Sequence, residues 1–286
     1  MTDAAGGPTV LRILLGTQLR KLREARGISA QQAARAIRGS ESKISRIELG
    51  RNAVREVDVA DLLALYGITE PDEREELLAL AGQANQAGWW HSYQDILPAW
   101  FQAYIGLEES AECIRSYDAQ FVPGLLQTQE YAAAVIALAN YTADETARLV
   151  YLRKERQRRF TVGPVRLWAI IDEVALRRPV GGRAVLAAQL EDLRQACDRP
   201  GFTIQVTPFS VGAHSVPGSF SILGFAAADL PDVVYLEQLT SAMYLDKRSD
   251  VDRYTEAMEN LGAISAEPDE TRQIISDMLA GLRRTG

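Results

Sequence analysis

The sequence has few of the residues that build metal centres, disulfide frameworks or membrane spans. Its 286 residues include two cysteines, Cys113 and Cys197, and two histidines, His91 and His214. These four lie too far apart for a metal-binding cluster, so we expect no metal site and two reduced thiols that fill cores on helical segments. No run approaches eighteen apolar residues, and the N-terminus lacks the charged start and apolar core of a signal peptide. We therefore expect a cytoplasmic protein without membrane contact.

The charge is unevenly distributed along the chain. Residues 1–66 contain eleven basic and seven acidic side chains, a net charge of +4, whereas the whole chain carries −7 and residues 67–286 therefore carry −11. A basic N-terminal part on an acidic remainder fits a nucleic-acid reader joined to a different kind of domain. The acidic part should repel DNA, so we expect DNA contact only in the basic part.

The stretch from Gly27 to Asn52 predicts two short helices separated by a tight turn. Ser29 can cap the first helix, which runs to Ile37, and Gln32 completes a capping box. The break falls at Arg38-Gly39, where we expect the glycine to take the left-handed conformation. Ser40 caps the second helix, which points Ile44 and Ile47 inward and ends at Gly50. A polar, partly basic second helix after such a turn is the layout of a helix-turn-helix.

Three further amphipathic segments surround this pair. We expect helices from Val10 to Arg26, from Glu56 to Tyr66, and from Pro71 onward, with Pro71 at a first helical position. Together they predict an all-α N-terminal domain of five helices over residues 10–82, behind a disordered tail of residues 1–9.

Residues 83–104 are unusually rich in aromatic side chains. We interpret this segment as a connector that packs at a domain or dimer contact, because tryptophan and tyrosine bury a large area and keep a polar tip. A base-stacking platform is the alternative, although no basic residue lies between Gly82 and Arg115. The candidate partner surface consists of Trp89, Trp90, Trp100, Phe101 and Tyr104.

Residues 105–286 predict an α+β domain with a small mixed sheet. The expected helices cover residues 105–117, 129–139, 142–160, 182–198, 248–261 and 268–282. The expected strands cover residues 165–171, 202–208, 219–225, 233–237 and 242–245, with a turn at residues 229–232. A regulatory or dimerisation role suits such a domain.

Polar residues near the predicted strand ends raise the possibility of an enzyme. They are Asp172, Glu173, Arg177, Arg178, His214 and Glu237. Glu173 and Arg177 are four residues apart, which more simply gives an ion pair on a helix. The chain lacks a phosphate-cradling glycine loop, a metal set and a recognisable nucleophile arrangement, so we expect neither an enzyme nor a cofactor.

The N-terminal pattern resembles a known family of DNA readers. The run L-G-T-Q-L-R-K-L-R-E-A-R-G-I-S, the pair Ala33-Ala34 and the run S-E-S-K-I-S-R-I-E-L-G-R-N are similar to the Xre/Cro-like repressor helix-turn-helix family over residues 12–67. The resemblance implies that residues 41–46 enter the major groove of double-stranded DNA. It places Glu41, Ser42, Ser45 and Arg46 at base edges, where Arg46 suits guanine and Glu41 suits cytosine. The implied phosphate contacts are Gln31, Gln32, Arg38, Lys43, Arg51 and Asn52.

Two details of this resemblance bear on single residues. Ala30 stands where the family commonly has a phosphate-binding glutamine, so Gln31 or Gln32 has to supply that contact. Glu48 is more often structural than a DNA contact in the family.

The remainder resembles a C-terminal domain of unknown function that is common in actinomycete Xre-type regulators. The resemblance rests on G-W-W, L-P-x-W, V-P-G-L-L-Q-T-x-x-Y-A, R-K-E-R-Q and I-I-D-E-V-A-L-R-R-P-V-G-G. Together the two resemblances imply a transcription factor with a protein- or ligand-responsive domain. We expect a sequence-specific transcriptional regulator that binds a palindromic operator as a homodimer. Two other readings stay open: an antitoxin-like module that sequesters a small partner protein, and a small-molecule sensor with an enzyme-like pocket.

Overall fold

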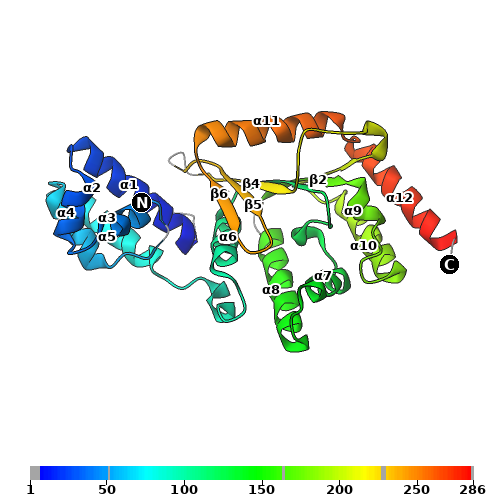
Figure 1. The fold of residues 1–286 in the computed structure, drawn as a ribbon, viewed down its shortest axis with the longest axis horizontal. Coiled ribbons are helices and arrows are strands. Elements are labelled where there is room, and N and C mark those ends of the chain that lie inside the picture. Colours follow the sequence, from blue (N-terminus) through cyan, green and yellow to red (C-terminus); the bar gives the residue numbers. More distant parts are fainter. Residues whose placement is uncertain (1–6, 51, 163–164, 227–229, 285–286) are drawn as a thin grey trace. The chain divides into compact units, whose positions relative to one another are not determined.

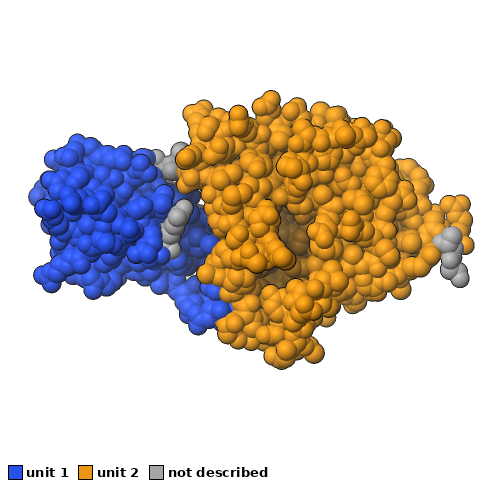
Figure 2. Space-filling model, in the orientation of Figure 1, with its two compact units in different colours: residues 1–94, 102–110, 227–230 blue, residues 95–101, 111–226, 231–286 orange. Residues whose placement is uncertain are grey.

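The computed structural model describes residues 7–50, 52–162, 165–226 and 230–284 and divides into two compact units. Unit 1 comprises residues 1–94, 102–110 and 227–230, and unit 2 comprises residues 95–101, 111–226 and 231–286 (Figure 2). The expected disordered tail falls mainly on residues 1–6, which lie outside the described residues, and the first helix already begins at Pro8.

Unit 1 is a bundle of helices, as the sequence predicts. Its helices are α1 (Pro8–Ala25), α2 (Ala30–Ala36), α3 (Glu41–Glu48), α4 (Glu56–Leu65) and α5 (Pro71–Ala84), followed by the 3-10 helix η1 (Trp89–Tyr93). Leu15, Leu19, Leu62 and Leu63 are almost fully buried in one core. Proline at the first turn of α1 and of α5 fits these starts, because the first helical N–H groups need no intrahelical acceptor.

Unit 2 is built on one six-stranded sheet with the order β3-β2-β1-β4-β5-β6 (Figure 1). The strands are β1 (Cys113–Asp118), β2 (Arg166–Asp172), β3 (Phe202–Thr207), β4 (Phe220–Gly224), β5 (Val233–Glu237) and β6 (Ala242–Leu245). β1, β2 and β3 pair in parallel, whereas β4, β5 and β6 join antiparallel. The predicted α+β domain with a mixed sheet is therefore confirmed.

Helices cover both faces of this sheet. They are α7 (Gln129–Ile136), α8 (Ala143–Val162), α9 (Glu173–Arg177), α10 (Arg183–Ala196), α11 (Arg248–Ile264) and α12 (Pro268–Arg284), with 3-10 turns η2 (Gly124–Leu126), η3 (Ala137–Ala139) and η4 (Phe209–Val211). α11 lies on one face, and α7 and α8 lie on the other (Figure 1). Tyr117, Ile170, Phe220 and Met258 fill the core beneath α11.

The start of α12 closes one edge of the sheet. At β3, the Val206 N–H donates to the hydroxyl of Thr271 (3.0 Å), and the Ala266 N–H donates to the Val206 carbonyl (2.9 Å). These bonds satisfy backbone groups that an unpaired edge strand would present to other chains.

The structure differs from the sequence-based prediction at β1. We expected a helix over residues 105–117, but α6 (Ala99–Ser110) ends earlier and residues 113–118 form a central strand. Ile114 and Tyr117 are buried and three residues apart, a spacing that a helix and a strand covered on both faces can share. Cys113 therefore lies on a strand rather than on a helix, and both cysteines are free thiols.

Candidate nucleic-acid interface

Each helix of the predicted helix-turn-helix has a side-chain cap. Ser29 Oγ accepts the Gln32 N–H (3.2 Å), and Gln32 Oε1 accepts the Ser29 N–H (2.8 Å), which completes the expected capping box. Ser40 Oγ accepts the Lys43 N–H (3.2 Å) at the start of α3. The caps satisfy N–H groups that the first helical turn leaves without an acceptor.

The turn between α2 and α3 differs from the expected one in a single residue. Arg38, and not Gly39, takes the left-handed conformation, with φ +51°. The Gly39 N–H donates to the Ala34 carbonyl (2.8 Å) and the Arg38 N–H to the Arg35 carbonyl (3.1 Å). These two bonds define a Schellman motif, which needs its left-handed residue one position before Gly39. The expectation at Gly39 was therefore wrong by one residue.

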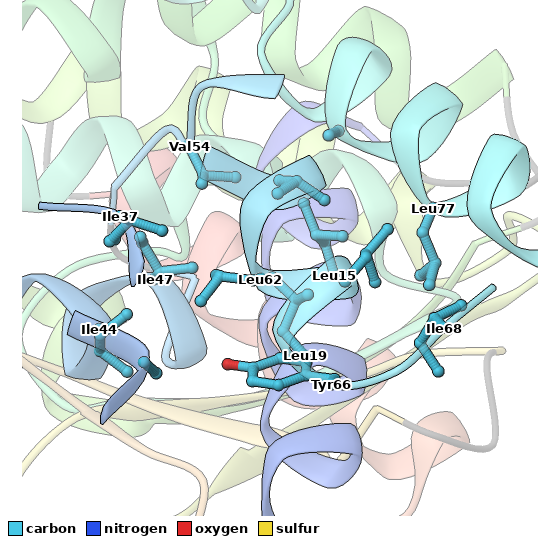
Figure 3. Packing of buried hydrophobic residues seen from close by; sticks show 14 of the residues in the cluster. Leu15, Leu19, Ile37, Ile44, Ile47, Val54, Leu62, Tyr66, Ile68 and Leu77 are labelled. Atoms are coloured by element: carbon cyan, nitrogen blue, oxygen red, sulfur yellow. The ribbon is translucent and has the colours of Figure 1, made fainter. Parts of the chain in front are cut away.

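Apolar contacts fix the inner face of α3. Ile44 and Ile47 are 1% and 3% exposed, and they lie near Ile37, Val54 and Leu62 in the core (Figure 3). Burial raises the pKa of the Tyr66 phenol in this core to about 12.

Two glycines allow α1 to approach the end of α3 closely. A Cβ at Gly16 would lie 2.3 Å from the Ile47 carbonyl oxygen and 2.8 Å from that of Glu48. Gly50 has φ +63°, and a Cβ there would lie 2.6 Å from the Ile13 Cα. Because these neighbours are backbone atoms, no rotamer change can make room for a side chain.

Ion pairs hold both ends of α3. At the end of α3, Arg23 donates to both carboxylate oxygens of Glu48, at 2.5 and 2.9 Å, with both side chains mostly buried. At its start, Lys43 Nζ donates to Asp58 Oδ2 (2.8 Å), and Arg55 donates to both Asp58 oxygens. The bonds from Arg55, followed by those from Lys43, hold the pKa of Asp58 below its usual range. Glu48 is therefore structural.

The outer face of α3 carries the four residues predicted to read bases. Glu41, Ser42, Ser45 and Arg46 are all exposed. Ser42, Ser45 and Arg46 are three and four residues apart, so they share one helix face, and Glu41 lies one turn before Ser45. The face offers an acidic group, two hydroxyls and a guanidinium, which together can accept from and donate to base edges.

The six predicted phosphate contacts differ in their surroundings. Gln31, Arg38 and Asn52 are exposed. Gln32 is engaged in its capping box and Lys43 in its ion pair with Asp58. Arg51 lies outside the described residues. The Asp58 network, which sequence reasoning missed, is signalled only by Arg55 three residues before an acidic residue in the first turn of α4.

The five aromatic residues of the predicted partner surface differ in burial. Trp90 and Tyr104 are 5% and 7% exposed, whereas Trp89, Trp100 and Phe101 are half-buried. Within unit 1, a Cβ at Gly106 would lie 2.9 Å from the Trp90 ring. Trp90 and Tyr104 therefore belong to the interior of the chain, and three aromatic residues of the predicted partner surface stay accessible.

In unit 2, the structure brings together some of the polar residues at the strand ends. His214 Nε2 lies 2.8 Å from the Tyr117 hydroxyl, which donates to Asp172 Oδ2 (3.2 Å). Asp172 also caps α9 by accepting the Val174 N–H. His214 Nδ1 accepts the Val216 N–H (3.3 Å), which leaves Nε2 to face the Tyr117 hydroxyl. All of these contacts are internal to the fold.

The neighbouring acidic groups also have structural partners. Glu173 is buried and accepts from Arg177 (2.7 Å) and from the Phe209 N–H (2.7 Å), which confirms the predicted ion pair. Burial, with a smaller contribution from Glu237, raises the pKa of Asp118 to about 7. Among the described residues, no three His, Cys, Asp or Glu side chains are placed to hold a metal ion together.

Comparison with known families agrees with the division of the chain. A model described as a helix-turn-helix domain matches residues 14–77, which include α2 and α3. The N-terminal part is thus a helix-turn-helix domain, which indicates a DNA-binding regulator. A second model, described as a domain of unknown function (DUF5753), matches residues 101–277. This is more than half of the chain, and the chain belongs to that family. No curated protein and no solved structure matches the chain.

None of the helices in the described part of the chain combines the length and the apolar composition that crossing a bilayer requires.

Proposed function

We propose that this protein is a sequence-specific transcriptional regulator of the Xre/Cro type that reads DNA with α3. One observation carries the proposal: Glu41, Ser42, Ser45 and Arg46 form an exposed polar row on a helix whose opposite face is locked into the core. A row fixed in this way can meet base edges in the major groove without reorganising the fold.

Phosphate contacts would set the register of α3 on the duplex. Arg38 lies in the turn just before α3, Gln31 lies in the first turn of α2, and Asn52 follows the end of α3; all three are exposed. Lys43 would have to share its ammonium group between Asp58 and a phosphate, so we expect it to contribute less than Arg38.

The protein would bind as a homodimer. Two copies related by a two-fold axis present two α3 helices to a palindrome whose half-sites lie about 34 Å apart. Because such a regulator binds operator DNA, it would act in the cytoplasm. The DUF5753 domain would then supply a sensing or partner-binding surface and no catalysis.

The test begins with the full-length chain and a selection of bound sequences from random DNA. Arg46→Ala should abolish specific protection of the selected operator, because a forked arginine–guanine pair contributes about 1–3 kcal/mol of discrimination. Arg248→Ala, which removes an equal charge from an exposed site on α11, is the matched control and should leave the footprint unchanged. An unaltered footprint with Arg46→Ala would refute the assignment of Arg46.

An antitoxin-like role is the second candidate function, favoured by an exposed apolar pair near β6. Leu239, in the β5–β6 connection, is 98% exposed, and Met243 on β6 is 49% exposed. A small protein encoded beside the gene could cover them. The test mixes the purified neighbour with the full-length chain and measures the mass of the complex. Leu239→Ser with Met243→Ser should weaken that complex, and unchanged binding would contradict this surface.

A further inference from the structure

A groove in unit 2 lies over β2 and β3, beside the end of α11 and the start of α12. Its cavity volume is about 300 Å³, the lower end of the range for small-molecule sites. The strands contribute Trp168, Thr203 and Gln205. The helices contribute Glu259, Gly262, Ala263, Glu267 and Pro268.

Trp168 is held in a fixed orientation in this groove. Its Nε1–H donates to Gln205 Oε1 (2.8 Å), and Gln205 Nε2 donates to the carbonyls of Gly262 and Ala266, each at 3.2 Å. A Cβ at Gly262 would lie 2.5 Å from the Trp168 ring, so the backbone of α11 lies against the indole. Because the indole N–H is already satisfied, the ring can offer a ligand only its carbon surface.

Both charged side chains in the lining of the groove are acidic. Glu259 and Glu267 are exposed, and the lining contains no basic side chain. The C-terminal carbonyls of α11 add partial negative charge. The N-terminus of α12 contributes partial positive charge, but Asp269 and Glu270 in its first turn offset that charge.

We propose that this groove binds a small organic cation, an ammonium or guanidinium compound, between Trp168 and the two glutamates. An aromatic face attracts a cation through the ring quadrupole, and the carboxylates add charge complementarity. The same chemistry can come from a free metabolite or from an arginine side chain of a partner. The site gives the DUF5753 domain a ligand class, and it does not depend on the DNA-binding proposal.

Fluorine NMR of the full-length chain labelled with 5-fluorotryptophan tests the site directly. The chain has four tryptophans, and Trp168→Phe identifies the resonance of Trp168. Titration with tetramethylammonium chloride should shift that resonance saturably and leave the other three in place, whereas sodium chloride at equal ionic strength should not. N-acetylarginine methylamide is the second probe. Saturation by the ammonium alone indicates a free quaternary cation, and saturation by both extends the site to an arginine side chain.

Charge removal supplies the decisive comparison. Glu259→Gln with Glu267→Gln should weaken binding at least tenfold. The control, Glu130→Gln with Asp144→Asn, removes two exposed charges from α7 and α8 on the other sheet face and should not. Far-ultraviolet circular dichroism and the thermal midpoints of the full-length chain report whether each variant is folded. No saturable shift with either probe, or unchanged affinity without Glu259 and Glu267, would overturn the proposal.

Discussion

Gly16→Ala should destabilise the helix-turn-helix domain, although the substitution improves the helix propensity of α1. An added Cβ would lie 2.3 Å from the Ile47 carbonyl oxygen and 2.8 Å from the Glu48 carbonyl oxygen. Both neighbours are backbone atoms at the end of α3, so the clash can be relieved only by moving α1 and α3 apart.

The magnitude follows from two opposing effects. Overpacking a close-packed interior costs about 1–3 kcal/mol, and the upper end applies where backbone has to move. Replacing a mid-helix glycine by alanine returns about 1 kcal/mol of helix propensity. We therefore expect a net loss of about 2 kcal/mol in the free energy of unfolding of this domain.

Hydrogen exchange in the full-length chain measures this loss locally, without assuming that the two units unfold together. A loss of about 2 kcal/mol should accelerate exchange of the protected amides in α1 and α3 roughly 30-fold. Gly82→Ala is the matched control in the same unit, because its Cβ meets only the flexible Glu56 carboxylate, at 3.2 Å. Exchange in Gly16→Ala that is as slow as in this control would refute the close-approach argument.

Three further predictions concern Arg38, Asp58 and Asp118. Arg38→Gly should relieve the left-handed strain at this position and raise the free energy of unfolding of the domain by roughly 1 kcal/mol. The same change removes a proposed phosphate contact, so DNA binding in a filter assay should weaken. A lower free energy of unfolding in the variant would contradict the turn geometry. Asp58→Asn should lower the free energy of unfolding by about 2 kcal/mol near neutral pH. Because the pKa of Asp58 is depressed in the folded state, its stabilisation is present above the unfolded-state pKa and is lost as the pH falls through the folded-state pKa. Denaturant unfolding should therefore give converging stabilities for the wild type and the variant in acid. The pKa of Asp118 is raised to about 7, so the wild type should lose stability as pH rises toward that value, and Asp118→Asn should raise the thermal midpoint more at about pH 8 than at about pH 5.

The sequence predicts the helix-turn-helix well because its signals are local. Ser29 and Ser40 mark two helix starts, and the structure places a cap at each. The inward positions of Ile44 and Ile47 follow from the helical period alone. The whole exposed row on α3 could therefore be located before any tertiary contact was known.

Features that depend on distant residues could not be found in this way. Arg23 and Glu48 are 25 positions apart, and Lys43 and Asp58 are 15 apart, so no local pattern predicts either pair. The groove at Trp168 needs α11 and α12 to cross two strands, which only the folded chain shows. The missed strand β1 has the same cause, because its burial on both faces comes from its central place in the sheet.

The short length of α3 explains why the face proposed to read DNA can be changed without loss of stability. An eight-residue helix is marginal in isolation, so α3 exists because its surroundings hold it. Asp58 holds its start, Glu48 and the close approach at Gly16 hold its end, and two isoleucines hold its inner face. None of these contacts uses the exposed row at 41, 42, 45 and 46. Substitutions in that row should therefore change which DNA is read without unfolding the domain, whereas substitutions at Gly16 or Asp58 should lower stability.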